Sequence, residues 1–174
     1  YYLNENDNET ALLYFQQATD LSKPGAGIFN SLYENANYRL AWTHYLLNDY
    51  DKALELFTLH QDYSERKNWN TGVPSITLEQ SFEYTALSFA ELADLENRQS
   101  VDIAKEYYET IGERNYTSEV FVYMAEELIK QVRVLEAIDI YQYLQEKWPY
   151  DANNPTYQKR LAELYLKEGE VDSY

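Results

Sequence analysis

Apolar residues recur every three or four positions along almost the whole chain, and this spacing constrains the fold more than any other feature. Examples are Leu12, Phe15 and Ala18; Leu40, Ala41 and Leu47; Ala53, Leu54 and Phe57; Val120, Met124 and Leu128; and Leu161, Leu164 and Tyr165. Such spacing places side chains on one face of an α-helix, whereas a half-buried strand needs apolar residues at alternate positions. The few glycine and proline residues lie mainly between the periodic segments, as helix breakers do. We therefore predict an all-α chain.

Polar caps and helix breakers predict where these helices begin and end. Asp49 precedes "YDKALELF", and its carboxylate is suited to accept hydrogen bonds from first-turn amides. Asn154 stands in the same way before Pro155, a residue favoured at the first helical position. The expected helix ends are "KPGAG", "WNTGVP", "IGERN" and "KWPYD". These signals predict helices in pairs, with short turns within a pair and longer connections between pairs.

A small residue followed four positions later by an aromatic one returns along the chain. The instances are Ala11 with Phe15, Ala53 with Phe57, Ala104 with Tyr108, and Ala137 with Tyr141. Small residues allow two paired helices to approach closely, and the rings fill the space toward the next pair. Because no pair buries its apolar face alone, we expect stability to come from packing between neighbouring pairs.

Three segments supply a common set of small, aromatic and breaker positions. Residues 38–57 supply Leu40, Ala41, Tyr50, Ala53 and Phe57; residues 121–149 supply Ala125, Ala137, Tyr141 and Pro149; residues 157–171 supply Leu161, Ala162, Tyr165 and Gly169. In these positions the chain resembles the tetratricopeptide repeat (TPR) family, whose repeat spans about 34 residues. His44, with Tyr45 beside it, occupies a position that is usually aromatic in the family. Residues 77–111 match only loosely.

The resemblance implies a right-handed α-solenoid of stacked antiparallel helix pairs that forms a single segment over residues 1–174. Its parts would be a partial repeat 1–24, a repeat 28–65, a divergent repeat 75–112, a repeat 117–149 and a partial repeat 154–174. We expect residues 3–18 to contain the end of one helix, a turn and a complete second helix. Because both ends interrupt a repeat, we expect the chain to be a segment of a longer TPR array.

Charge and composition exclude several classes of partner. Thirty acidic residues against fourteen basic ones give a formal net charge of −16, which repels a nucleic-acid backbone and an anionic membrane surface. No apolar run approaches the roughly 20 residues that a membrane-spanning helix needs, so we expect no direct membrane insertion of this segment. The chain has no cysteine, which excludes disulfides, thiolate metal sites and cysteine nucleophiles.

The pattern of reactive side chains predicts neither an enzyme nor a cofactor. His44 and His60 fall on different expected helices, and His44 takes a core-facing position, which favours a packed histidine over a general base or metal ligand. The "NENDNE" segment at 4–9 lacks the glycine and final glutamate of a calcium loop, so we expect no metal site. Phosphate loops, nucleophile elbows and zinc-binding helices are not present in the sequence.

The resemblance implies that the first helix of each pair lines a concave binding side. The candidate protein-binding residues are Asn35, Tyr38, Arg39, Trp42, Tyr45, Glu126 and Ile129, with Glu119, Val122, Lys159, Arg160, Glu163 and Leu166 at equivalent positions. Aromatic rings with a polar group, such as Tyr38, Trp42 and Tyr45, are enriched at binding hot spots. The alternative is that these rings pack against neighbouring helices or the 61–76 connection.

The sequence thus favours a non-catalytic TPR scaffold that holds a protein or peptide within a larger assembly. The alternatives are a structural spacer or self-association segment, or a regulatory domain of a larger enzyme. The tyrosine-rich repeats are also similar in style to TPR proteins of bacterial cell envelopes, which implies the periplasm or the inner face of the outer membrane; a cytoplasmic scaffold is the alternative.

Overall fold

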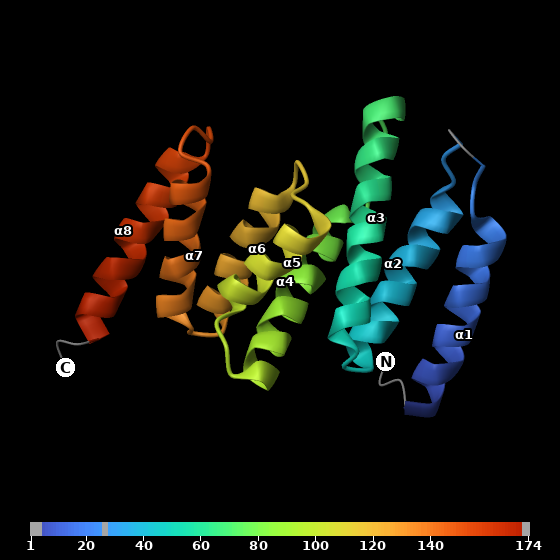
Figure 1. Cartoon of the computed structure of the whole chain (residues 1–174), viewed down its shortest axis with the longest axis horizontal. Coiled ribbons are helices and arrows are strands. Elements are labelled where there is room, and N and C mark those ends of the chain that lie inside the picture. Colours follow the sequence, from blue (N-terminus) through green and yellow to red (C-terminus); the bar gives the residue numbers. More distant parts are fainter. Residues whose placement is uncertain (1–4, 26–27, 172–174) are drawn as a thin grey trace. The chain divides into compact units, whose positions relative to one another are not determined.

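The computed structural model of the protein describes residues 5–25 and 28–171, and most of these residues lie in α-helices (Figure 1). Within these ranges there is no strand, which confirms the all-α prediction. The helices are α1 (Glu5–Ser22), α2 (Ser31–Leu46), α3 (Tyr50–Thr71), α4 (Leu78–Glu96), α5 (Ser100–Ile111), α6 (Thr117–Lys130), α7 (Val134–Lys147) and α8 (Asn154–Val171).

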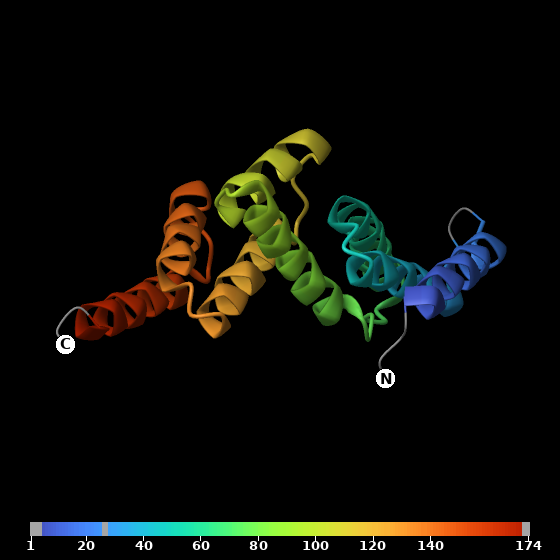
Figure 2. The same ribbon diagram turned by 90° about the horizontal axis from the view of Figure 1, so that it is seen from below.

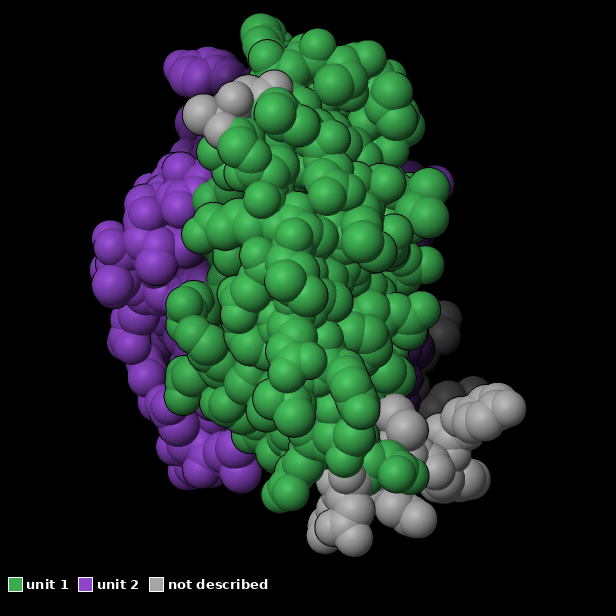
Figure 3. Space-filling view, turned by 90° about the vertical axis from the view of Figure 1, so that its right-hand side faces the viewer, with its two compact units in different colours: residues 1–88 green, residues 89–174 purple. Residues whose placement is uncertain are grey.

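Two compact units divide the chain, residues 1–88 and residues 89–174 (Figure 3). The boundary falls inside α4, so the first half of this helix belongs to the first unit and the rest to the second. Each unit has its own packed interior, and each is described separately below.

The first unit packs α1 against α2, and α2 against α3 (Figures 1 and 2). The short connection 47–49 joins α2 and α3 into a hairpin. Asn30 caps the start of α2, where its side-chain oxygen accepts a hydrogen bond from the Leu32 amide at 2.9 Å. The core cluster of the hairpin contains Tyr38, Leu40, Ala41, Ala53, Leu56 and Phe57. Leu12 and Phe15 of α1 pack against this cluster.

The second unit contains the end of α4 and helices α5 to α8. Here α6 and α7 form the central hairpin, α8 packs on α7, and α5 also contacts α7. The fully or almost fully buried side chains of the hairpin are Val120, Phe121, Met124, Ala125, Ala137, Ile140, Tyr141 and Leu144.

Three of the four recurring pairs of a small and an aromatic residue make the contacts expected of them, whereas Ala11 of the first pair is only half-buried. Ala53, Ala104 and Ala137 are completely buried. The aromatic residue four positions after each of these alanines contacts a ring on the next helix. The ring pairs and their centroid separations are Phe57 with Tyr84 at 6.1 Å, Tyr108 with Phe121 at 6.1 Å, and Tyr141 with Tyr157 at 5.9 Å. These rings therefore connect each helix to a following one.

Both ends of the chain depart from the expectation. A single continuous helix, α1, covers Glu5–Ser22, so the turn expected within residues 3–18 is wrong. Residues 5–9 contain no breaker, and their acidic side chains suit the positive end of a helix dipole. Residues 1–4 lie outside the described part of the chain. At the other end Ala162 is exposed, whereas the repeat pattern predicts a buried small residue.

Two predicted helix caps are also wrong. The carboxylate of Asp49 makes no capping hydrogen bond, because its Oδ2 instead lies 2.8 Å from Nδ1 of His44. Asn154 is already the first residue of α8. Its side-chain nitrogen donates to the Trp148 carbonyl at 2.9 Å, and its side-chain oxygen has no partner. In both places the side chain bonds to a residue outside the first turn of the helix that it was expected to cap.

The predicted repeats 75–112 and 117–149 each contain one helix pair, α4 with α5 and α6 with α7. The predicted repeat 28–65 contains α2 but ends before α3 does, since α3 continues to Thr71. The partial repeats 1–24 and 154–174 contain α1 and α8. The stacking of all pairs into one right-handed solenoid stays a prediction.

A bulky residue at Ala137 tests the close approach of α6 and α7. Ala137→Leu is expected to lower the free energy of unfolding of the second unit by about 1–3 kcal/mol, because the fully buried site has no room for three more carbons. Urea denaturation followed by tryptophan fluorescence measures the loss. Asp139→Leu, which adds the same side chain at an exposed position of α7, is the matched control; equal losses in the two variants would contradict the packing argument.

Candidate protein-binding surfaces

The predicted binding residues of α2 divide into exposed and packed side chains. Asn35 and Arg39 are exposed, whereas Tyr38 is only 8% exposed. The ring of Tyr38 lies 6.1 Å from that of Phe57 and 5.7 Å from the imidazole of His60. This burial raises the pKa of Tyr38 to about 12. Tyr38 is thus part of the core of the first unit.

Trp42 and Tyr45 are half-buried at the edge of the same core. Both rings meet Tyr84 of α4 edge to face, with centroids 6.4 Å and 5.1 Å apart. Tyr45 also contacts Tyr50 at the start of α3. The structure therefore brings these rings together around Tyr84, which agrees with the alternative that they pack against neighbouring helices. Their role in binding stays a prediction, and Asn35 and Arg39 are the members of the set that face solvent.

Glu126 on α6 is the centre of a polar contact between helices in the second unit. Its carboxylate accepts a hydrogen bond from the hydroxyl of Tyr141 at 2.7 Å and another from the guanidinium of Arg160 at 2.9 Å. Burial, followed by the contact with Glu126, raises the pKa of Tyr141 well above its usual range. The side chain of Glu126 is therefore already engaged by α7 and α8. Ile129 is half-buried one turn further along α6.

A hollow of about 490 Å³ lies between the beginnings of α6 and α8. Ser118, Glu119 and Val122 line it on one side, and Thr156 and Tyr157 line it on the other. The ring of Tyr157 is anchored by its contact with Tyr141. Glu119 and Val122 are two of the residues that the repeat pattern assigns to the concave side. The lining combines the apolar side chain of Val122 and the ring of Tyr157 with three hydroxyls, the amides of Asn115 and Asn153, and the carboxylate of Glu119.

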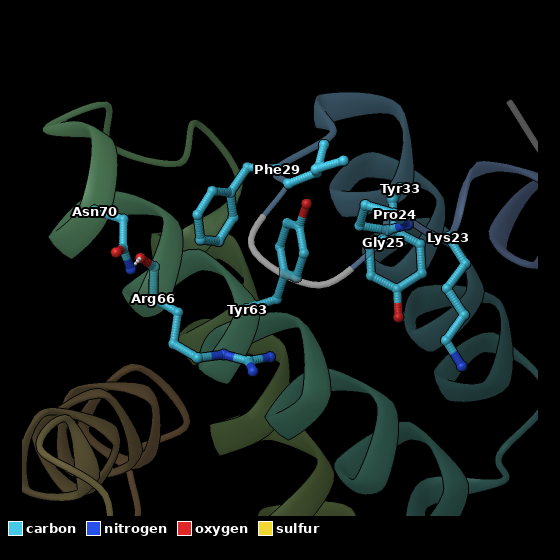
Figure 4. A pocket seen from close by; sticks show the side chains of 9 residues that line it. Lys23, Pro24, Gly25, Phe29, Tyr33, Tyr63, Arg66 and Asn70 are labelled. Atoms are coloured by element: carbon cyan, nitrogen blue, oxygen red, sulfur yellow. Dashed lines mark hydrogen bonds between the residues drawn. The ribbon is translucent and has the colours of Figure 1, made fainter.

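Sequence reasoning missed a second hollow, of about 380 Å³, in the first unit. Figure 4 shows the rings of Phe29, Tyr33 and Tyr63 around it, with Lys23 and Arg66 on its two sides. The ring of Tyr63 meets Phe29 and Tyr33 edge to face, with centroids 5.7 Å and 5.0 Å away. These rings come from the segment before α2, from α2 and from α3. The backbone amide of Asn30 donates to the Tyr63 hydroxyl at 2.6 Å. Because these two residues are more than 30 positions apart in the sequence, no local pattern predicts the hollow.

The reactive groups of the first unit lie in a buried polar network. Glu34 of α2 forms an ion pair with Lys67 and accepts a hydrogen bond from the Ser64 hydroxyl at 2.8 Å. Nε2 of His60 lies 2.9 Å from the Thr77 hydroxyl and 3.5 Å from that of Ser64. Serine, histidine and carboxylate are thus neighbours, but the carboxylate contacts the serine instead of orienting the histidine, and His60 and Ser64 are completely buried. The arrangement joins helices and offers no access to a substrate.

Burial decides the protonation of this network. Burial lowers the pKa of His60 to about 4, even though the nearby carboxylate of Glu34 acts in the opposite direction. For Glu34, burial alone would raise the pKa, but the hydrogen bonds from Lys67 and Ser64 outweigh it and lower the pKa. At neutral pH the network therefore contains a neutral imidazole beside a paired carboxylate and ammonium.

Next to the same network, α3 and α4 meet through an amide and two hydroxyls. The side-chain nitrogen of Gln61 donates to the hydroxyls of Ser81 at 3.0 Å and Thr85 at 2.8 Å. All three side chains are completely buried. This contact fixes the first half of α4 on α3 by hydrogen bonds.

Over the ranges that the structure describes, no helix has the length and hydropathy of a membrane span. Over the same ranges, no group of three or more histidine, aspartate or glutamate side chains is arranged to hold a metal ion.

Comparison with known proteins leaves the chain without an assigned family. No protein-family model matches it. No curated protein matches it either. What the fold itself defines is the class, an all-helical protein with the hairpins α2–α3 and α6–α7 in its two units.

Proposed function

We propose that this chain is a non-catalytic helical scaffold of the TPR type, and that its second unit binds a peptide segment of a partner protein in the hollow between α6 and α8. One observation carries the proposal. The repeat pattern assigns Glu119 and Val122 of α6 to a binding side. These residues line a hollow of about 490 Å³ together with Tyr157 of α8, the first helix of the next predicted repeat. Peptide grooves in helical scaffolds form between such helices.

The chemistry of the hollow favours a partner segment with a basic residue beside an apolar one. Val122 and Tyr157 offer apolar area, whereas Ser118 and Thr156 offer hydroxyls that pair with peptide groups. The carboxylate of Glu119 favours a cation, and the net charge of −16 attracts basic segments over a longer range. The hollow therefore discriminates by charge as well as by shape.

In the first unit, Asn35 and Arg39 extend the proposed binding role to α2. Both side chains are exposed on the helix whose aromatic residues form the edge of the core. In this proposal, Trp42 and Tyr45 pack beneath Asn35 and Arg39, and the exposed edges of the two rings form part of the same binding surface. Glu126 and Ile129 have the corresponding position on α6.

The proposed setting is a larger assembly in a bacterial cell envelope, at the periplasmic side or the inner face of the outer membrane, with the cytoplasm as the alternative. The tyrosine-rich repeat style supports this setting. A spacer or self-association role, or the regulatory part of a larger enzyme, is the alternative function. Exposed leucines on α1 and α8 favour self-association among these alternatives.

Selection of peptides on the immobilised chain tests the α6–α8 hollow. Selected peptides are expected to carry a basic residue next to an apolar one, and to bind the Glu119→Lys, Val122→Asp double variant at least about tenfold more weakly, because the cation and the apolar contact are both lost. Fluorescence anisotropy with labelled peptides measures the affinities.

The matched control changes an exposed face of α7 in the same way, through Asp139→Lys and Leu135→Asp. This control variant is expected to bind like the unmodified chain. Peptides that bind both double variants equally well, or a selection in which no peptide is enriched, would refute the proposed groove.

A further inference from the structure

The hollow beside Tyr63 in the first unit combines aromatic walls with basic side chains (Figure 4). We refer to it as the Tyr63 hollow. The rings of Phe29, Tyr33 and Tyr63 line it together with Lys23 and Arg66, and none of the described residues in its lining is acidic. The chain as a whole carries thirty acidic residues against fourteen basic ones. The charge of this lining is therefore opposite to that of the chain.

The two basic side chains at the hollow have no carboxylate partner. Most basic residues of the chain form ion pairs, as Lys67 does with Glu34 and Arg133 does with Glu136. Within the described part of the chain, neither Lys23 nor Arg66 forms such a pair. Both side chains are exposed. They can therefore attract a dissolved anion without first giving up an ion pair inside the protein.

The aromatic walls of the Tyr63 hollow are fixed in place. Tyr33 and Tyr63 are both buried, and the ring of Tyr63 meets those of Phe29 and Tyr33 edge to face. The hydroxyl of Tyr63 accepts a hydrogen bond from the backbone amide of Asn30 at 2.6 Å and donates to its carbonyl oxygen at 3.3 Å. Walls that are ordered in advance reduce the conformational entropy lost when a ligand binds.

The guanidinium of Arg66 is held by one nitrogen only. Its Nε donates to the backbone carbonyl of Asp62, one turn earlier on α3, at 3.2 Å. This contact leaves the two terminal nitrogens for a ligand. A planar guanidinium presents its nitrogens in the geometry that matches the two oxygens of a carboxylate.

We propose that the Tyr63 hollow binds a small carboxylic acid that carries an aromatic ring. The ring packs against Phe29 and Tyr63, the carboxylate pairs with Arg66, and Lys23 adds to the positive potential from the other side of the hollow. A volume of about 380 Å³ is near the lower end of the range of about 300–1,000 Å³ that is typical of small-molecule sites. The hollow therefore suits a compact ligand of one or two rings.

This proposal is independent of the peptide-binding hollow between α6 and α8. The described lining of the Tyr63 hollow belongs entirely to the first unit, whereas α6 and α8 belong to the second. The two sites also select opposite charges, since Glu119 favours a cation and Arg66 an anion. The failure of one proposal would thus leave the other unaffected.

The pair of 2-naphthoate and its neutral amide, 2-naphthamide, tests the carboxylate contact, because both compounds carry the same rings. In an NMR titration of the isotope-labelled chain, 2-naphthoate is expected to shift the amide signals of Phe29, Tyr33 and Tyr63. Its dissociation constant is expected to be at least about tenfold lower than that of the amide. Acetate, which lacks the rings, is expected to bind at least about tenfold more weakly than 2-naphthoate.

Substitution of the basic residues locates the contact within the hollow. Arg66→Gln is expected to weaken the binding of 2-naphthoate at least about tenfold, and Lys23→Gln about threefold. Both positions are exposed, so the fold is expected to be retained. Lys52→Gln is the matched control, because it removes one positive charge from α3 outside the hollow, and it is expected to bind like the unmodified chain.

Three results would overturn the proposal. The first is equal binding of 2-naphthoate and 2-naphthamide, which would show that the carboxylate makes no contact. The second is a titration in which 2-naphthoate shifts none of the signals of Phe29, Tyr33 and Tyr63. The third is equal weakening by Arg66→Gln and Lys52→Gln, which would indicate a general effect of net charge.

Discussion

Phe57→Ala is expected to lower the free energy of unfolding of the first unit by about 3–5 kcal/mol. The side chain of Phe57 is completely buried in the core cluster between α2 and α3. It also stacks on Tyr84 of α4 and contacts Tyr38. Truncation therefore removes packing with three helices at once and leaves a cavity that their backbones cannot close. The expected loss is a large part of the stability of a typical domain.

The loss is expected to be confined to residues 1–88, since the chain divides into two compact units. Hydrogen exchange followed by mass spectrometry separates the two units, because peptides from α2 and α3 report one and peptides from α6 and α7 report the other. Leu59→Ala, at a 41% exposed position of α3, is the matched control and is expected to cost about 0.5 kcal/mol or less. Similar exchange in the two variants would show that Phe57 is not a centre of the core.

Acidification from pH 6.5 to pH 4 is expected to destabilise the first unit by about 3 kcal/mol through His60 alone. Burial lowers the pKa of this imidazole from 6.5 to about 4, and one pKa unit corresponds to about 1.4 kcal/mol. Between these two values the unfolded chain binds a proton that the folded chain does not. The stability contributed by the neutral imidazole is therefore complete above pH 6.5, falls as the pH decreases, and is lost at about pH 4.

Urea denaturation at a series of pH values measures this dependence, and His60→Gln isolates it. Glutamine keeps a polar group beside the Thr77 hydroxyl but does not titrate. Glu34 and Lys67 face position 60 in both proteins. Their contribution therefore cancels when one pH profile is subtracted from the other, and the difference reports the titration of His60. Parallel profiles for the unmodified chain and His60→Gln would contradict the assigned role of burial.

The features that the sequence predicts correctly depend on local pattern or on pairs of neighbouring helices. Apolar periodicity predicts the all-α fold because each helix buries one face. The aromatic residues at 57, 108 and 141 make ring contacts with following helices because the spacing from the small residue fixes where they point. The same logic correctly assigns burial to Ala53 and Ala137.

Other features of the structure depend on contacts that a single helix does not encode. Tyr38, Trp42 and Tyr45 share one face of α2, but the approach of Tyr84 from α4 decides how much of each ring is exposed. The pattern that predicts burial of Ala162 is correct only when a further helix covers it. The hollow beside Tyr63 assembles from segments far apart in the sequence, so no local pattern predicts it.

The hydrogen bonds from Gln61 to Ser81 and Thr85 have a consequence for how the first unit selects its native arrangement. A purely apolar contact between α3 and α4 would tolerate sliding of one helix along the other. A displacement of α4 by one helical turn, about 5.4 Å, would bring one of these hydroxyls to the place of the other, because Ser81 and Thr85 are four residues apart, so the amide nitrogen of Gln61 would lose one of its two acceptors in a site that water does not reach. An unmade buried hydrogen bond costs about 1–3 kcal/mol. These three side chains therefore disfavour displaced positions of α4 along α3 that a contact between apolar side chains would permit.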